Sequence, residues 1–137
     1  MMKTSIFPTI SILSIFLFFL LGCNDDQECA GVACTADYRI VTIEVKDQNG
    51  DPVLLDAYNV LIVNTNERLT FDPEVPTGGQ YTLVEDQHMS LISSDGTLLL
   101  FEGLINDEVI ASEEFVVGHD CCHVIKVSGP DEVVINL

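Results

Sequence analysis

Tryptophan is absent from this 137-residue sequence, and basic residues are scarce, with five Lys and Arg against 22 Asp and Glu and a net charge of −17. A chain this acidic repels polyanions, so nucleic acid is excluded as a partner. The lack of tryptophan weighs against sugar binding, which usually relies on aromatic stacking. Three Tyr and seven Phe keep a glycan partner open.

Short sequence motifs of catalytic and phosphate-binding sites are also missing. The sequence has no Gly-x-Ser-x-Gly elbow and no glycine-rich phosphate loop. The acidic pair Glu113-Glu114 falls in a strand-like run, where adjacent side chains face opposite ways, so it is no paired-carboxylate site. We therefore expect a non-enzyme without a cofactor.

The N-terminus has the parts of an export signal. Lys3 precedes an apolar run, Ile6 to Leu21, which is interrupted by Pro8 and by hydroxyl residues. The run is shorter than the roughly 20 apolar residues that cross a bilayer, which disfavours a membrane span. We expect a cleaved signal over 1–22, a lipidated acidic tether over 23–36 and one domain over 37–137.

Leu20-Leu21-Gly22-Cys23 resembles the lipobox of bacterial lipoproteins. The resemblance implies that a peptidase cuts before Cys23 and that this cysteine becomes an acylated, palmitate-bearing N-terminus, with the lipid bilayer as its partner. Removing the signal leaves four basic residues against 22 acidic ones, a net charge of −18.

The residues Asn24-Asp25-Asp26-Gln27-Glu28 follow the lipobox. One interpretation is a solvated spacer, extended by repulsion between like charges. The other is that they resemble the surface-export signal of Bacteroidota lipoproteins. That resemblance implies an outer-membrane location, on the cell surface, with the periplasmic face as the alternative.

Four further cysteines remain after Cys23: Cys29, Cys34, Cys121 and Cys122. Export to an oxidising compartment favours two disulfides, for which three connectivities exist. We expect each cysteine of the first pair to join one of the second. The alternative, a local bridge in the first pair and a vicinal one in the second, strains the preferred disulfide geometry.

Short apolar or alternating runs recur through the rest of the chain, between turn residues. The expected strands cover 38–46, 57–64, 69–71, 81–84, 97–102, 108–117, 122–127 and 132–137. Asn49-Gly50 and Asn106-Asp107 are typical of tight turns. Helical periodicity is lacking, so we predict an all-β fold, a single antiparallel β-sandwich of seven to eight strands.

The run Ile43 to Val53, followed by Ala57-Tyr58-Asn59-Val60, is similar to the opening of carboxypeptidase regulatory-like, or transthyretin-like, domains. The resemblance implies an Ig-like sandwich whose first hairpin is formed by these two strands. Gly79 to Leu83 loosely matches a later strand of such domains, and Phe115 to Val124 looks like a segment of small Bacteroidota lipoproteins of unassigned function.

Potential ligands cluster in His119-Asp120-Cys121-Cys122-His123. Oxidation would remove both thiols, and two imidazoles make a weak site, so a structural disulfide is favoured and His119 and His123 are only weak metal candidates. The spacing Asp47-x-Asn49-x-Asp51 opens like a calcium loop, but Pro52 stands where glycine is required, which favours a turn.

The sequence thus predicts a membrane-anchored envelope lipoprotein whose sandwich is a non-catalytic binding or interaction module, such as an accessory subunit of a surface complex. Sandwich loops and exposed sheet edges are where such modules meet a protein or glycan partner. Two alternatives remain open: a structural envelope protein without a specific ligand, and a metal-binding protein using His119 and His123.

Overall fold

A computed structural model describes residues 29–71 and 78–137. The expected signal peptide, the lipidation site Cys23 and the acidic run after it lie outside the described residues. Ala33–Leu137 form one compact unit. Within the described ranges, no helix has the length and apolar character needed to cross a membrane.

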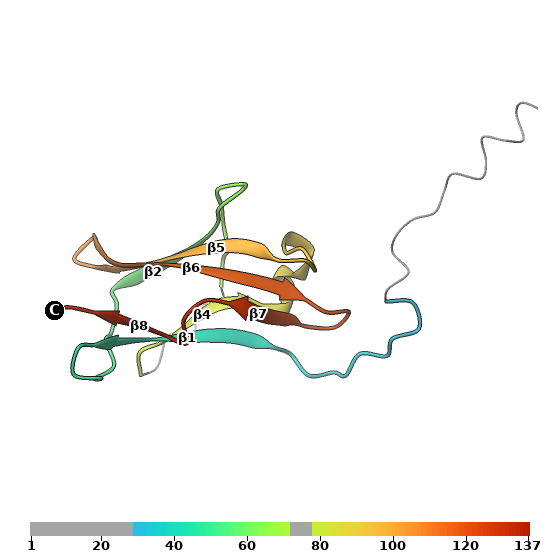
Figure 1. The fold of residues 1–137 in the computed structure, drawn as a ribbon, viewed down its shortest axis with the longest axis horizontal. Coiled ribbons are helices and arrows are strands. Elements are labelled where there is room, and N and C mark those ends of the chain that lie inside the picture. Colours follow the sequence, from blue (N-terminus) through green and yellow to red (C-terminus); the bar gives the residue numbers. More distant parts are fainter. Residues whose placement is uncertain (1–28, 72–77) are drawn as a thin grey trace, which may run out of the picture. The chain divides into compact units, whose positions relative to one another are not determined.

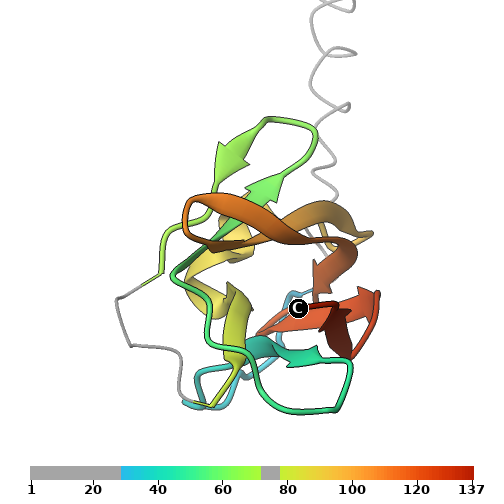
Figure 2. The same cartoon turned by 90° about the vertical axis from the view of Figure 1, so that its left-hand side faces the viewer.

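The described part of this unit contains eight strands and one short 3-10 helix (Figure 1). They are β1 (Ile40–Asp47), β2 (Ala57–Ile62), β3 (Glu67–Arg68), β4 (Gln80–Glu85), η2 (Asp86–Leu91), β5 (Thr97–Ile105), β6 (Glu108–His119), β7 (Val124–Ser128) and β8 (Glu132–Ile135). Three strands form one sheet in the order β4-β1-β8, and five form the other in the order β3-β2-β5-β6-β7. The end-on view shows the two layers (Figure 2).

The predicted β-sandwich is confirmed in this coarse form, with one correction and one element that the sequence did not predict. β1 and β8 pair in parallel, so the three-stranded sheet is mixed rather than antiparallel. The segment Asp86–Leu91, for which the sequence predicted no defined element, forms a short 3-10 helix. A 3-10 helix of only six residues is too short to show sequence periodicity, which explains why the pattern of apolar residues did not reveal it.

The core lies between the sheets and is built from alternate strand residues, as period-2 patterning requires. Val45, Val60, Leu83, Phe101 and Val117 are fully buried. Aromatic rings from both sheets meet in this core: Tyr58 of β2 and Tyr81 of β4 pack edge to face, with their ring centroids 5.3 Å apart. Phe101 lies beside both rings.

The hairpin expected between the first two strands does not form, because β1 and β2 belong to different sheets. The turn after β1 is real: the Asp47 carboxylate accepts the N–H groups of Asn49 and Asp51, at 2.8 and 2.9 Å. The chain pairs with β1 only briefly, at Pro52, and then crosses to the other sheet. Buried Tyr81 fixes this crossing, since its hydroxyl donates to the Val53 carbonyl and accepts the Leu55 N–H.

The hairpin expected around Asn106-Asp107 does form, between β5 and β6. Both turn residues have positive φ, 52° and 62°, the backbone of a type I′ turn that matches the twist of the strands. The first strand continues to Ile105, three residues beyond the predicted end, because Gly103 pairs within the ladder and does not terminate it.

Candidate functional site

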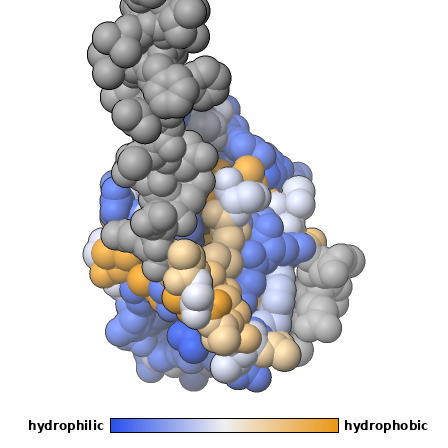
Figure 3. All heavy atoms as spheres, turned by 90° about the vertical axis from the view of Figure 1, so that its right-hand side faces the viewer, coloured by the Kyte–Doolittle hydropathy of each residue, from blue (hydrophilic) through white to orange (hydrophobic). Residues whose placement is uncertain are grey.

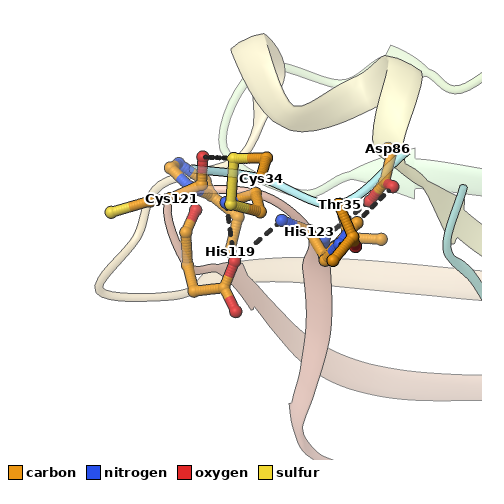
Figure 4. Close-up of a disulfide and its surroundings, with 9 residues drawn as sticks. Cys34, Thr35, Asp86, His119, Cys121 and His123 are labelled. Atoms are coloured by element: carbon orange, nitrogen blue, oxygen red, sulfur yellow. Dashed lines mark hydrogen bonds and ion pairs between the residues drawn. A yellow bond between two sulfur atoms is a disulfide. The ribbon is translucent and has the colours of Figure 1, made fainter. Parts of the chain in front are cut away.

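The chemistry-bearing residues gather at one end of the sandwich, which we call the disulfide end (Figure 4). Three parts of the chain meet there. They are the lead that precedes β1, with Cys34 and Thr35, the start of η2, with Asp86, and the turn between β6 and β7, with Cys122 and His123.

A disulfide joins Cys34 to Cys122 across 88 residues of sequence. Cys29 and Cys121 are disulfide-bonded as well. The expectation that the early pair is bridged to the late pair is confirmed for Cys34 and Cys122, and the vicinal alternative is wrong. This bridge fastens the lead covalently to the β6–β7 turn.

Asp86 holds the same three segments together by hydrogen bonds. Its carboxylate accepts the backbone N–H of Arg39 at 2.7 Å and that of Val124 at 2.9 Å. The Asp86 N–H in turn donates to the Arg39 carbonyl. Desolvation raises the pKa of Asp86, but the hydrogen bonds from His123 and the two backbone amides outweigh it, so the net pKa lies below the ordinary value.

His123 completes the arrangement. Its Nδ1 lies 2.8 Å from the Asp86 carboxylate, and both side chains are mostly buried, at 14% and 12% exposure. Its Nε2 lies 3.4 Å from the Thr35 hydroxyl. Carboxylate, imidazole and hydroxyl therefore follow one another as they do in acyl-transfer triads.

The surroundings of Asp86, His123 and Thr35 favour a structural role over a catalytic one. In a triad the carboxylate serves mainly to orient the imidazole, whereas Asp86 also binds one backbone amide from the lead and one from β7. Thr35 is itself exposed and lies next to the disulfide. We call the Cys34–Cys122 bridge and the contacts of Asp86 and His123 the clasp.

Asp120 shapes the turn that carries Cys122 and His123. Its carboxylate accepts the N–H of Cys122 at 2.7 Å and that of His123 at 2.8 Å, and these backbone hydrogen bonds lower its pKa. The Asp120 N–H closes the turn by donating to the His123 carbonyl. The ring of His119, at the end of β6, contacts the Asp120 carbonyl through Nδ1 at 2.7 Å.

The weak metal candidates, His119 and His123, therefore both have protein partners. The cysteines nearby are oxidised and offer no thiolate. Across residues 29–71 and 78–137, no group of three or more His, Cys, Asp or Glu side chains is placed to hold a metal ion. Metal binding stays a prediction without a specific observation in its favour.

Sequence reasoning missed Asp86, Thr35 and Arg39 as members of this site. Thr35 and Asp86 lie 88 and 37 residues from His123, so no local spacing could relate them. The available signal was the disulfide alone, which predicted that the lead meets the segment around Cys122.

Apolar side chains are exposed near this end. Tyr38 and Ile40 are about half exposed, at 56% and 48%, and Leu91 is 41% exposed. Seen from this side, hydrophobic residues form a band between hydrophilic surfaces (Figure 3). Such mixed surfaces are typical of places where proteins meet partners.

Fold and site together define a small disulfide-bonded β-sandwich module whose N-terminal lead is fastened to the fold. No family model matches the chain, and neither do curated proteins or solved structures.

Proposed function

We propose that this chain is an envelope lipoprotein, anchored through acylated Cys23, and that its β-sandwich is a non-catalytic interaction module of the Ig-like, transthyretin-like kind. The observation that carries the proposal is the covalent attachment of the lead at Cys34, eleven residues after the lipobox cysteine. A tether of eleven residues reaches at most about 40 Å, which keeps the domain close to the bilayer.

The clasp suits a domain held by its N-terminus. Without it, a pull on the tether would act on the start of β1, whose first residues pair with the end of β4. The Cys34–Cys122 bridge transfers that load to the β6–β7 turn, and the Asp86 contacts support it with two backbone hydrogen bonds. The sheets can then present the same surfaces whatever the tether does.

Fatty-acid labelling tests the anchor. Cys23→Ala should abolish metabolic labelling by a fatty-acid probe, because no other residue offers the thiol at the signal's end. Cys34→Ser is the matched control, since it removes a cysteine of the folded domain and should leave labelling intact. Persistent labelling of the Cys23 variant would contradict the anchor.

Protease accessibility of a tagged protein on intact cells tests the location. Cleavage on intact cells supports display at the surface, whereas protection that is lost only on permeabilising the outer membrane supports the periplasmic face. Either result is compatible with an interaction module, and each restricts the partners that it can meet.

An activity probe tests the non-catalytic part of the proposal. Among the described residues, Asp86, His123 and Thr35 follow one another in the order of an acyl-transfer triad. A fluorophosphonate should leave Thr35 unmodified, because the Asp86–His123 pair serves the clasp. Labelling of wild type that Thr35→Val removes would contradict the proposal.

A further inference from the structure

The outer face of the five-stranded sheet departs from the usual pattern of an antiparallel sheet, whose solvent face is polar. Inward residues of its central strands are buried, such as Val60, Leu99 and Phe101. Their strand neighbours therefore face outward. Many of these outward residues are apolar: Leu61, Val63, Leu98, Leu100, Val116, Ile125 and Val127.

The ladder register orders the face into rows, because directly paired residues point to the same side. One row runs across β3, β2, β5 and β6 as Arg68, Leu61, Leu100, Glu114. This row therefore has a positive side chain at one end, two apolar side chains in the middle and a negative side chain at the other end. With neighbouring strands about 4.8 Å apart, the two charges stand about 14 Å from each other.

The row on one side of this one is apolar, and the row on the other side is polar. On one side, Val63 lies beside Leu98, to whose carbonyl its N–H donates. On the other side, Asn59 pairs with Glu102. Val63 is 42% exposed, so the first of these rows reaches the surface.

From this register we infer that the face binds a second copy of the chain, packed sheet on sheet around a two-fold axis that runs along the strands, between β2 and β5. Such an axis exchanges β2 with β5 and β3 with β6. It places Leu61 against the second copy's Leu100, and Val63 against the second copy's Leu98. Face-to-face sheets pack about 10 Å apart, with their strands within about 30° of alignment, which this axis permits.

The same axis brings opposite charges together. Arg68 meets the second copy's Glu114, and the symmetric pair repeats on the other side of the axis. Asn59 meets the second copy's Glu102, so an amide donor faces a carboxylate. Arg68 and Glu114 are both exposed, and no ion pair inside the described ranges engages either of them.

The pairing deepens the interaction role proposed above and rests on it for the setting in which copies meet. A stable dimer usually buries about 800 Å² on each partner. Anchoring to one membrane would raise the effective concentration and promote a contact that is weak in solution. Lipid labelling tests the anchor and a charge exchange tests the pairing, so one can fail without the other.

Sedimentation velocity of the full chain in mild detergent, at about 0.15 M salt, tests the dimer. Wild type should associate reversibly. Arg68→Glu or Glu114→Arg should each weaken association about tenfold, since each places two like-charge pairs in the interface. The double variant restores opposite charges and should return to within about threefold of wild type.

Glu113→Arg is the matched control. It makes the same change of charge one residue away on β6, facing the other side of the sheet, and should leave association unchanged. Circular dichroism should show that every variant is folded. The inference is overturned by a wild type that stays monomeric up to about 100 μM, a concentration at which even a dissociation constant of a few hundred micromolar gives visible dimer. It is also overturned if single exchanges have no effect or if the double variant is no better than the single ones.

Discussion

Two neighbouring side chains at the start of η2 show how single polar residues hold the loops of this fold. Asp86 binds the lead and β7. His88, two residues on, is buried: its Nδ1 accepts the Glu85 N–H, and its Nε2 lies 3.0 Å from the Thr70 carbonyl. In the described part of the chain, no buried side-chain nitrogen or oxygen lacks a partner. Loss of one such residue leaves its partners unpaired, which costs more than the bond contributes.

Asp86→Asn should lower the free energy of unfolding by about 1–3 kcal/mol near neutral pH, because a charged acceptor of several hydrogen bonds is lost. The lowered pKa of Asp86 means that its contribution is complete above the unfolded-state pKa of about 3.9 and is lost as the pH falls through the still lower folded-state pKa. The difference in stability between wild type and variant should therefore shrink from about pH 5 down to about pH 2.

Denaturant unfolding of both proteins at a series of pH values measures this difference. Asp95→Asn provides the control, because Asp95 is exposed on the turn before β5 and should change the stability by less than about 0.5 kcal/mol. A difference for Asp86→Asn that is equally large at pH 2 and at pH 6 would contradict the role given to its charge.

At the scale of elements, the β5–β6 hairpin is the most strongly specified part of the fold. Its two strands form the longest ladder, from Thr97–Val117 to Ile105–Glu108, and they carry Leu99, Phe101 and Phe115 into the core. The turn places Asn106 and Asp107 at positive φ, where asparagine is well tolerated and glycine is preferred at the second position.

Asp107→Gly should therefore stabilise the protein, by about 0.5–1 kcal/mol, since glycine adopts φ of 62° without a steric penalty. Asp107→Ala is the matched comparison and should be destabilising, because it keeps the Cβ and removes the polar side chain that favours this region. Thermal unfolding of the three proteins gives the order. A glycine variant less stable than wild type would show that the Asp107 side chain contributes more than its backbone costs.

At the scale of the whole molecule, the clasp closes the chain from the lead to the end of β6 into one covalent loop, with β7 and β8 outside it. The Cys34–Cys122 bridge spans 88 residues, and the chain-entropy relation assigns about 4–5 kcal/mol to a loop of this length. Other constraints on the unfolded chain reduce that figure, because Cys29 and Cys121 are also disulfide-bonded.

The double variant Cys34→Ser, Cys122→Ser should lose about 2–4 kcal/mol of unfolding free energy. Its melting temperature should fall by at least about 8 °C, given about 4–8 °C per kcal/mol for a domain of this size. Calorimetry with and without reductant measures both effects, and reductant should bring wild type at least as low as the variant. A loss below about 1 kcal/mol would mean that the clasp does not stabilise the folded domain.

Much of the fold follows from local patterns. Alternation of apolar and polar residues over Tyr38 to Lys46 predicts β1, and two turn-forming residues after Ile105 predict the central hairpin. These signals suffice because side-chain direction in a strand has period two and because tight turns demand particular backbone angles. The resemblance to transthyretin-like domains placed β1 and β2 in one hairpin, wrongly, since a turn fixes chain reversal without fixing the sheet that the next strand enters.

By itself, then, the sequence determined the β-sandwich class and the strongly acidic character, which depend on residue type and short-range periodicity, and it favoured a disulfide link between the early and late cysteines while leaving the pairing open. The expectation of a lipid anchor rests on it as well. Tertiary structure alone decided the parallel β1–β8 pair, the meeting of Asp86, His123 and Thr35, and the charged and apolar rows of the outer face. These features join residues tens of positions apart, and their contacts depend on strand order and register, which only the packing of the whole chain selects.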